Sequence, residues 1–309
     1  MLPGAALAMT DTAALRERLA RLKAPPARSS PQGLGELAAR IDRLRGRAAT
    51  RPATNGRSLA AALGGDEVAA GLVLVGRAFP LWHRVGRVPL SALAKARGES
   101  LPDDPVRCLF LDTETTGLAG GTGTVAWMVG LARLGPGGFR LRQWVIAGFA
   151  AEAPMLAALA AEVRPDDVLV SFNGKCYDLP LLATRYRLHG IADPFAAMPH
   201  LDLRHPLRRQ YGAGLPDGRL KTFEESLLGH RRDGDLPGAA APAAWLRWLR
   251  EGRVGLLPEV ARHNRADLLA MGALFPCLGT ERSGRSSPPA ASASPDLPAA
   301  QRRRKQHHT

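Results

Sequence analysis

The alternation of apolar and polar residues predicts an α/β domain over residues 104–278. Apolar runs of strand length lie at 106–113, 125–134, 139–148, 168–172 and 200–203. Segments typical of helices lie at 152–163, 179–189, 219–229, 242–251 and 255–275. Short turns separate the first three strands, which predicts antiparallel pairing, whereas the last two alternate with helices, which predicts parallel pairing. We therefore expect a central mixed five-stranded sheet, three antiparallel strands and then parallel additions, flanked by helices.

The segments on either side of this domain have a different character. Residues 1–56 are basic and contain two helical patterns broken by prolines, so we expect a partly helical, mobile leader. Residues 57–103 predict a small β-rich leader segment, with short strands at 68–75 and 87–90. Residues 279–309 are rich in Ser, Pro and Ala and end in a basic run, which is typical of a disordered tail.

The net charge of +14 is concentrated outside the domain. Residues 1–100 carry a net charge of +9 and residues 276–309 carry +4, while the part between them is close to neutral at +1. Basic arms on a neutral body can gather a nucleic acid through its phosphates. Two alternatives stay open: the arginine excess also follows from GC-rich coding, and such arms could dock a partner protein instead.

The cysteines and the apolar runs argue against a disulfide-rich, zinc-binding, membrane-spanning or secreted protein. The three cysteines, Cys108, Cys176 and Cys277, are far apart and odd in number, which argues against a disulfide framework or a zinc site. No apolar run approaches the ~20 residues of a membrane helix. The first ten residues lack the basic start and the apolar length of a secretory signal. We expect a cytoplasmic protein that does not enter a membrane.

The stretch Asp112-Thr113-Glu114 is the first candidate for chemistry. It continues the apolar run of the first strand without a break, and side chains two residues apart on a strand face the same way, about 7 Å apart. Two carboxylates at the end of a buried strand repel each other and lose hydration, which is costly unless a cation compensates. Hard oxygen ligands of this kind suit Mg²⁺ or Mn²⁺. The structural alternative is a strand that ends in a solvated acidic turn.

Two further sites carry carboxylates. Asn173 follows the fourth strand and Asp178 stands where the next helix begins, at the end of a sheet where ligands bind in parallel units. His263 and Asp267 are four residues apart on the last helix and share a face. Each site has a structural alternative. Asp178 could be a helix N-cap that contributes ~1 kcal/mol, and His263 with Asp267 could be a surface pair.

The three sites, in this order, resemble the motifs of the DEDD 3′–5′ exonucleases, which have the ribonuclease H-like fold. More narrowly, residues 104–275 resemble the YprB-type branch of ribonuclease H-like proteins. The matching stretches are Leu111–Thr124, Asn173-Gly-Lys, His200-Leu-Asp-Leu, Leu220-Lys-Thr, Asp235-Leu-Pro-Gly and His263-Asn-x-x-Asp.

The resemblance implies a role for each acidic residue. Asp112, Glu114, Asp178 and Asp267 would hold two divalent cations, Mg²⁺ or Mn²⁺. His263 would take the place of the residue that manages the attacking water. It stands four residues before Asp267, which is the spacing of the tyrosine subgroup, whereas the histidine subgroup usually has five.

The implied function is that of a metal-dependent nuclease, a 3′–5′ exonuclease that hydrolyses phosphodiester bonds of DNA or RNA by a two-metal mechanism. We expect Thr115, Asn173 and Lys175 to bind the substrate, a nucleic acid with a single-stranded 3′ end. Lys175 is alternatively a solvated loop lysine. A ribonuclease H-like endonuclease and a catalytically silent nucleic-acid-binding module are the competing hypotheses.

Overall fold

A mixed sheet of seven strands runs through the part of the chain that the computed structural model describes, residues 56–99, 101–117, 123–236 and 239–279. The strands lie in the order β1-β2-β7-β6-β5-β8-β9. Their bounds are β1 Asp66–Ala69, β2 Leu72–Phe79, β5 Cys108–Thr115, β6 Ala126–Gly135, β7 Gly138–Ile146, β8 Val168–Ser171 and β9 His200–Asp202. The predicted leader up to residue 55, the tail from residue 280 and most of the glycine-rich turn, 118–122, lie outside the described residues.

Five of these strands are the ones that the sequence pattern predicts. β5, β6 and β7 pair antiparallel in succession, β8 pairs parallel with β5, and β9 pairs parallel with β8. The predicted number of strands is too low by two, because β2 pairs antiparallel with the outer edge of β7 and β1 pairs with β2. The β-rich segment at 57–103 therefore extends the main sheet and covers an edge of β7 that would otherwise expose unpaired backbone groups. Only the hairpin of β3, Arg84–Val85, and β4, Val88–Pro89, forms a separate sheet within the described chain.

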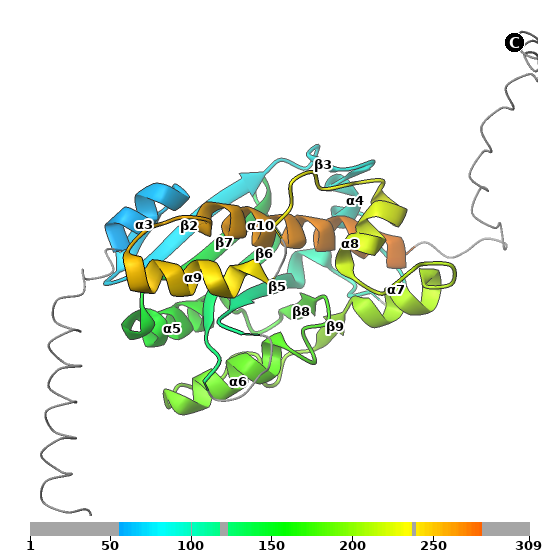
Figure 1. Cartoon of the computed structure of the whole chain (residues 1–309). Coiled ribbons are helices and arrows are strands. Elements are labelled where there is room, and N and C mark those ends of the chain that lie inside the picture. Colours follow the sequence, from blue (N-terminus) through cyan, green and yellow to red (C-terminus); the bar gives the residue numbers. More distant parts are fainter. Residues whose placement is uncertain (1–55, 100, 118–122, 237–238, 280–309) are drawn as a thin grey trace, which may run out of the picture. The chain divides into compact units, whose positions relative to one another are not determined.

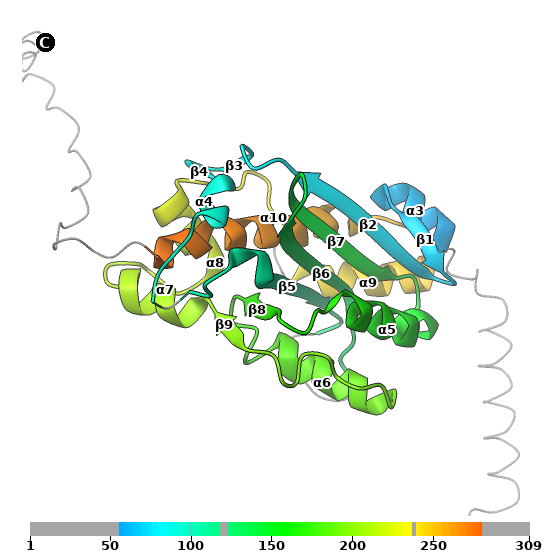
Figure 2. The same cartoon turned by 180° about the vertical axis from the view of Figure 1, so that it is seen from behind.

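Helices cover both faces of the main sheet. Figures 1 and 2 show α9 and α10 on one face and α5 on the opposite face. The helices are α3 Gly56–Leu63, α4 Ser91–Ala94, α5 Glu152–Glu162, α6 Asp178–Leu188, α7 Arg204–Tyr211, α8 Leu220–Phe223, α9 Ala240–Glu251 and α10 Leu257–Leu274, with short helical turns η1 Pro105–Arg107, η2 Phe149–Ala151 and η4 Phe275–Leu278 and the π-helical turn η3 Glu224–Leu228. All five predicted helices are present, the third of them as α8 followed by η3, and α3, α4 and α7 are additional. Within the described residues, no helix has both the length and the apolar character needed to span a bilayer.

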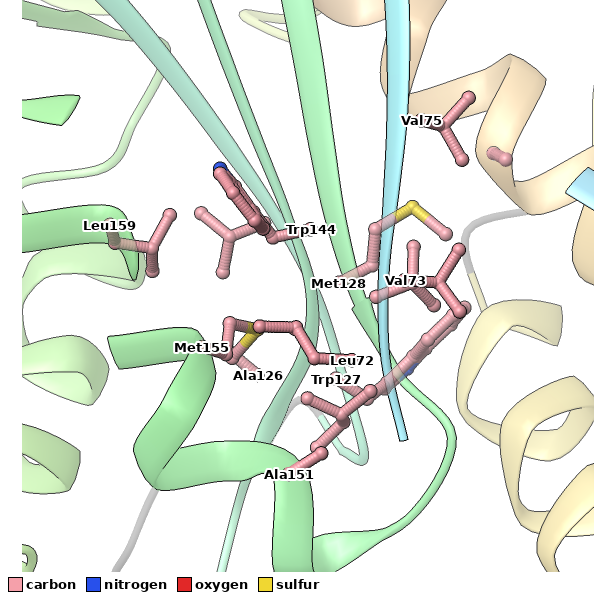
Figure 3. Close-up of a cluster of buried hydrophobic side chains, with 14 of the residues drawn as sticks. Leu72, Val73, Val75, Ala126, Trp127, Met128, Trp144, Ala151, Met155 and Leu159 are labelled. Atoms are coloured by element: carbon pink, nitrogen blue, oxygen red, sulfur yellow. The ribbon is translucent and has the colours of Figure 1, made fainter. Parts of the chain in front are cut away.

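The two faces of the sheet carry separate layers of apolar side chains, as strand alternation requires. Figure 3 shows Trp144 together with Met155 and Leu159 of α5 on one side of the strands, and Val73 and Met128 on the other. All of these side chains are buried. The sheet is therefore held between α5 and the α9–α10 layer by hydrophobic contacts on both faces.

Helix α10 lies unusually close to the sheet at Gly130 of β6. A Cβ atom at Gly130 would stand 2.3 Å from Asn264 Oδ1 and 2.6 Å from Leu268 Cδ1, both on α10. Real Cβ contacts are not that short, so only glycine permits this approach. Gly130 pairs with Asp112 of β5, and the close approach brings the polar face of α10 to the end of that strand.

Candidate active site

Asp112 and Glu114 lie on β5 where α10 crosses it. The Asp112 carboxylate Oδ2 accepts a hydrogen bond from Asn264 Nδ2 of α10 at 2.7 Å, so this acid faces the helix. Glu114, two residues further along the strand, is only 8% exposed. The alternative of a strand that ends in a solvated acidic turn is therefore wrong for Glu114, since β5 continues to Thr115 and Glu114 is a buried residue within it.

Burial and mutual repulsion raise the pKa of both acids. Desolvation raises the pKa of Asp112 well above its usual value, and the charges of Asp267, Glu114 and Asp178 raise it further. Desolvation also raises the pKa of Glu114 to about 8, followed by the charges of Asp267, Asp178 and Asp235. The four predicted acidic ligands are thus close enough to repel one another, as residues that share cations would be.

Asp178 begins α6 beside β5. Its carboxylate accepts a hydrogen bond from the Thr113 hydroxyl, and the side chain makes no N-cap hydrogen bond, since Tyr177 holds the cap position. The N-cap interpretation of Asp178 is therefore wrong. Desolvation raises the pKa of Asp178 to about 6, although the Thr113 hydrogen bond opposes that rise.

A pocket of about 250 Å³ opens between the end of β5 and the start of α6. It is lined by Asp112, Thr113, Thr115, Gly117, Thr124, Phe172, Asn173, Tyr177, Asp178 and Leu181. Two of the three predicted substrate residues, Thr115 and Asn173, are therefore in the same pocket as two of the acids. The third, Lys175, is an exposed residue outside the pocket lining.

Helix α10 supplies the last two predicted residues. Nε2 of His263 lies 3.6 Å from Oδ2 of Asp267, one helical turn away, and both side chains are about four-fifths buried. Nδ1 of His263 lies 2.7 Å from Oδ1 of Asp235. Because an ionised carboxylate only accepts hydrogen bonds, Nδ1 carries the proton and Nε2 is left to face Asp267. Burial would raise the pKa of Asp235, but the hydrogen bond and charge of His263, the charge of Arg232 and a backbone hydrogen bond at Leu236 together lower that pKa.

Sequence reasoning missed the polar residues that hold Asp112 in place. Asn264 is fully buried, and its amide also donates to the Asp112 backbone oxygen at 3.2 Å. Gln143 of β7, fully buried as well, donates from Nε2 to Asn264 Oδ1 and to the Ala261 backbone oxygen, both at 2.8 Å. Asn264 stands next to His263 in the third motif, but a single asparagine gives no signal that it braces a carboxylate.

Asp202, at the end of β9, organises the loop between β8 and α6. Its Oδ1 accepts the backbone N–H groups of Asn173 at 2.7 Å and Arg204 at 3.2 Å, and its Oδ2 accepts that of Lys175 at 3.1 Å. Asn173 has a φ of 67°, a left-handed conformation that asparagine tolerates. A Cβ at Gly174 would meet Ser171 Oγ at 2.4 Å, so glycine is required there. The Asp202 carboxylate thus fixes the turn that presents Asn173 and leads into Asp178.

A sequence model of the ribonuclease H superfamily matches residues 109–278, which contain every predicted site residue. The chain belongs to this superfamily. The chain is also 32% identical over 198 residues to the protein YprB of Bacillus subtilis, described as uncharacterized. That alignment covers 63% of this chain and 46% of YprB, so the chain spans about half the length of its relative.

Solved structures that are similar to this superfamily member include a polymerase and an exonuclease. The family B DNA polymerase of the archaeon Pyrobaculum calidifontis gives a TM-score of 0.43 at 16% identity, covering 67% of this chain and 29% of that one. A product-bound structure of exonuclease I gives 0.32 at 18% identity, covering 48% of this chain and 44% of that one. An ExoI/SSB-Ct complex gives 0.32 at 17% identity, covering 48% and 42%. Similarities this weak do not bear on the site, and membership rests on the superfamily match.

The donor atoms of the site suit a hard divalent cation. Asp112, Glu114 and Asp178 offer carboxylate oxygens, and none of them has an ion pair with a Lys, Arg or His of the described chain. As the side chains stand, however, no three His, Cys, Asp or Glu residues within the described ranges are grouped so that they could hold a metal ion. Asp267 is paired instead with Arg232, whose Nη1 lies 2.6 Å from Asp267 Oδ1.

Proposed function

We propose that this chain is a metal-dependent nuclease that hydrolyses phosphodiester bonds of DNA or RNA as a 3′–5′ exonuclease. The observation that carries the proposal is Glu114, a buried carboxylate with raised pKa among three other acids. No ion pair or hydrogen bond to its side chain occurs within the described residues, so no protein group there favours its ionised form. A bound cation would favour that form, because an opposite charge close to a carboxylate lowers its pKa.

Asp112, Glu114, Asp178 and Asp267 are the residues that would hold two divalent cations. Such cations, when bound, lower the pKa of an attacking water and stabilise the leaving oxygen of a displacement at phosphorus. The chain supplies the geometry around them. Asn264 fixes the rotamer of Asp112 through its 2.7 Å hydrogen bond, and the Thr113 hydroxyl fixes that of Asp178.

His263 is the residue proposed to take up the proton of the attacking water. In the tautomer in which Nδ1–H is held by Asp235, the lone pair is on Nε2, 3.6 Å from Oδ2 of Asp267. An imidazole nitrogen with a free lone pair can act as a general base towards a water within hydrogen-bonding reach. The Asp235 carboxylate then stabilises the imidazolium that forms.

The pocket between β5 and α6 is proposed to receive the end of a single strand. Thr115 and Asn173 offer polar groups inside the pocket. Tyr177, which is 60% exposed, also lines the pocket. Exposed aromatic rings bind single strands by stacking on bases, without sequence preference. Lys175, exposed on the same loop, is the residue proposed to contact a backbone phosphate.

The test is to incubate 3′-labelled and 5′-labelled DNA and RNA oligomers with the protein and Mn²⁺ and to resolve the products as ladders. The expected result is stepwise removal of nucleotides from the 3′ end. Asp112→Asn should abolish this activity, and Asp233→Asn, which changes an exposed acid outside the cluster, should retain it. Cleavage of a circular single strand would identify an endonuclease. Binding of the oligomers without any cleavage would identify a silent binding module and overturn the proposal.

A further inference from the structure

Arg232, between η3 and α9, joins the active site to a buried acid outside the predicted motifs. Its Nη1 lies 2.6 Å from Oδ1 of Asp267 and 3.5 Å from Oδ2 of Asp235. On its other side, Nη2 lies 2.8 Å from Oε2 of Glu224, and Nε donates to Oε1 of Glu224 at 3.1 Å. The side chain is only 7% exposed. One guanidinium thus touches three carboxylates, one of them a predicted metal ligand.

Glu224 anchors this guanidinium from behind. It begins the π-helical turn η3 and its side chain is 1% exposed. Its Oε1 accepts the hydrogen bond from Arg232 Nε, while Oε2 and Nη2 lie close together as an ion pair without hydrogen-bond geometry. Burial raises the pKa of Glu224 even though the Arg232 hydrogen bond and charge oppose that rise. Short π-helical turns often occur at functional sites. Arg232 is therefore held in place by Glu224, independently of Asp267.

The four acids of the site are unequal as a result. Asp267 has a protein cation in contact, whereas Asp112, Glu114 and Asp178 form no ion pair with any basic side chain in the described part of the chain. An arginine remains charged at every accessible pH, so it does not leave Asp267 by losing its proton. A divalent cation that uses Asp267 Oδ1 has to displace the guanidinium from that oxygen.

We propose that Arg232 is the resident counter-ion of Asp267 and that a divalent cation must compete with Arg232 for this carboxylate. Cation binding at Asp267 is therefore weaker than cation binding on the pocket side, which Asp112 and Asp178 share. This inference rests on the proposed metal-dependent function. It adds that the two cation positions differ in affinity and that Arg232 sets the difference. Glu224 keeps the displaced guanidinium at the edge of the site.

The test measures Mn²⁺ binding directly, by titration calorimetry and by the electron paramagnetic resonance signal of free Mn²⁺, in the absence of nucleic acid. Wild-type protein is expected to show one stronger and one weaker class of site. Arg232→Gln is expected to tighten the weaker class by about tenfold or more, the effect of removing a competing, largely buried ion pair. Arg231→Gln removes an equal charge from the neighbouring exposed residue and is expected to leave both classes within about twofold, since exposed charges are well screened.

Arg232→Gln leaves the buried Glu224 with only His230, 3.6 Å away, as an ionic neighbour, which is expected to destabilise the protein. The double variant Glu224→Gln/Arg232→Gln removes both charges and is expected to show the same tightening of Mn²⁺ binding. Unchanged or weaker Mn²⁺ binding in a folded variant would overturn the role of Arg232 while leaving the nuclease proposal intact. If wild-type and variant proteins alike bind no Mn²⁺, the proposed metal-dependent function itself fails.

Discussion

Replacement of Glu114 by glutamine tests whether burial and the neighbouring acids raise the pKa of this carboxyl group. The pKa of Glu114 is raised from an ordinary 4.5 to about 8. Between these values the folded protein keeps a proton that the unfolded chain has released. Stability therefore falls as the pH rises, by up to ~1.4 kcal/mol per pH unit. From pH 5 to pH 8 the loss amounts to roughly 3 kcal/mol for this one group.

Glu114→Gln removes this titration. In the presence of EDTA, we expect the free energy of unfolding of the wild type to fall between pH 5 and pH 8 by roughly 3 kcal/mol more than that of the variant. Urea unfolding followed by tryptophan fluorescence measures this, because Trp127, Trp245 and Trp248 are buried in the core. Glu225→Gln, an exposed glutamate on η3, is the matched control and should follow the wild type.

Addition of Mn²⁺ completes the experiment. A cation that binds only the folded, deprotonated site stabilises it by mass action, so the wild type should regain at pH 8 most of the stability lost in EDTA. Glu114→Gln should gain less, because it has lost a ligand. Parallel pH profiles for wild type and Glu114→Gln in EDTA would refute the claim that Glu114 is a buried carboxylate under repulsion.

Two further predictions concern acids that are paired within the protein. Asp202→Ala leaves three backbone N–H groups without their acceptor, so we expect a loss of roughly 2–4 kcal/mol in urea unfolding and a fall in nuclease rate, with Asp233→Ala as the exposed control. Burial would raise the pKa of Glu152, but hydrogen bonds from Arg185 and His189 outweigh it and hold that pKa below 4.5. Glu152→Gln should therefore cost about 3 kcal/mol at pH 7. The deficit, measured by the same unfolding assay, should be lost as the pH falls through the lowered pKa of Glu152 in the folded protein. A deficit that does not change with pH would contradict the assigned ion pair.

The sheet and the first acidic pair could be predicted because both depend on local pattern. Alternation along β5 places Asp112 and Glu114 on one face, and the continuous apolar run before them marks a central strand. The two added strands were harder to predict, since Val68 to Val75 is separated from its partner β7 by more than sixty residues of chain. Nothing in that segment distinguishes an edge of the main sheet from a small separate hairpin.

The residues that position the site could not be predicted, because their contacts cross between distant segments. Asn264 and Gln143 meet 121 residues apart in sequence. Arg232 is one of many arginines in the chain, and its neighbour Arg231 is exposed and unremarkable. Only the approach of η3 to α10 shows which of the two guanidinium groups reaches Asp267.

The buried acids, taken together, support the proposed position of the site. Of the glutamates and aspartates that are buried in the described chain, Asp167 is paired with Arg133, Glu152 with Arg185, Glu224 with Arg232, and Asp202 with three backbone N–H groups. Glu114 is the one buried acid there without such a partner. Folding alone would favour an apolar residue at that position, since a buried carboxyl group without a partner is destabilising whether it is protonated or ionised. A carboxylate that the fold does not compensate is most simply explained by a ligand that does, and its neighbours Asp112, Asp178 and Asp267 define where that ligand would bind.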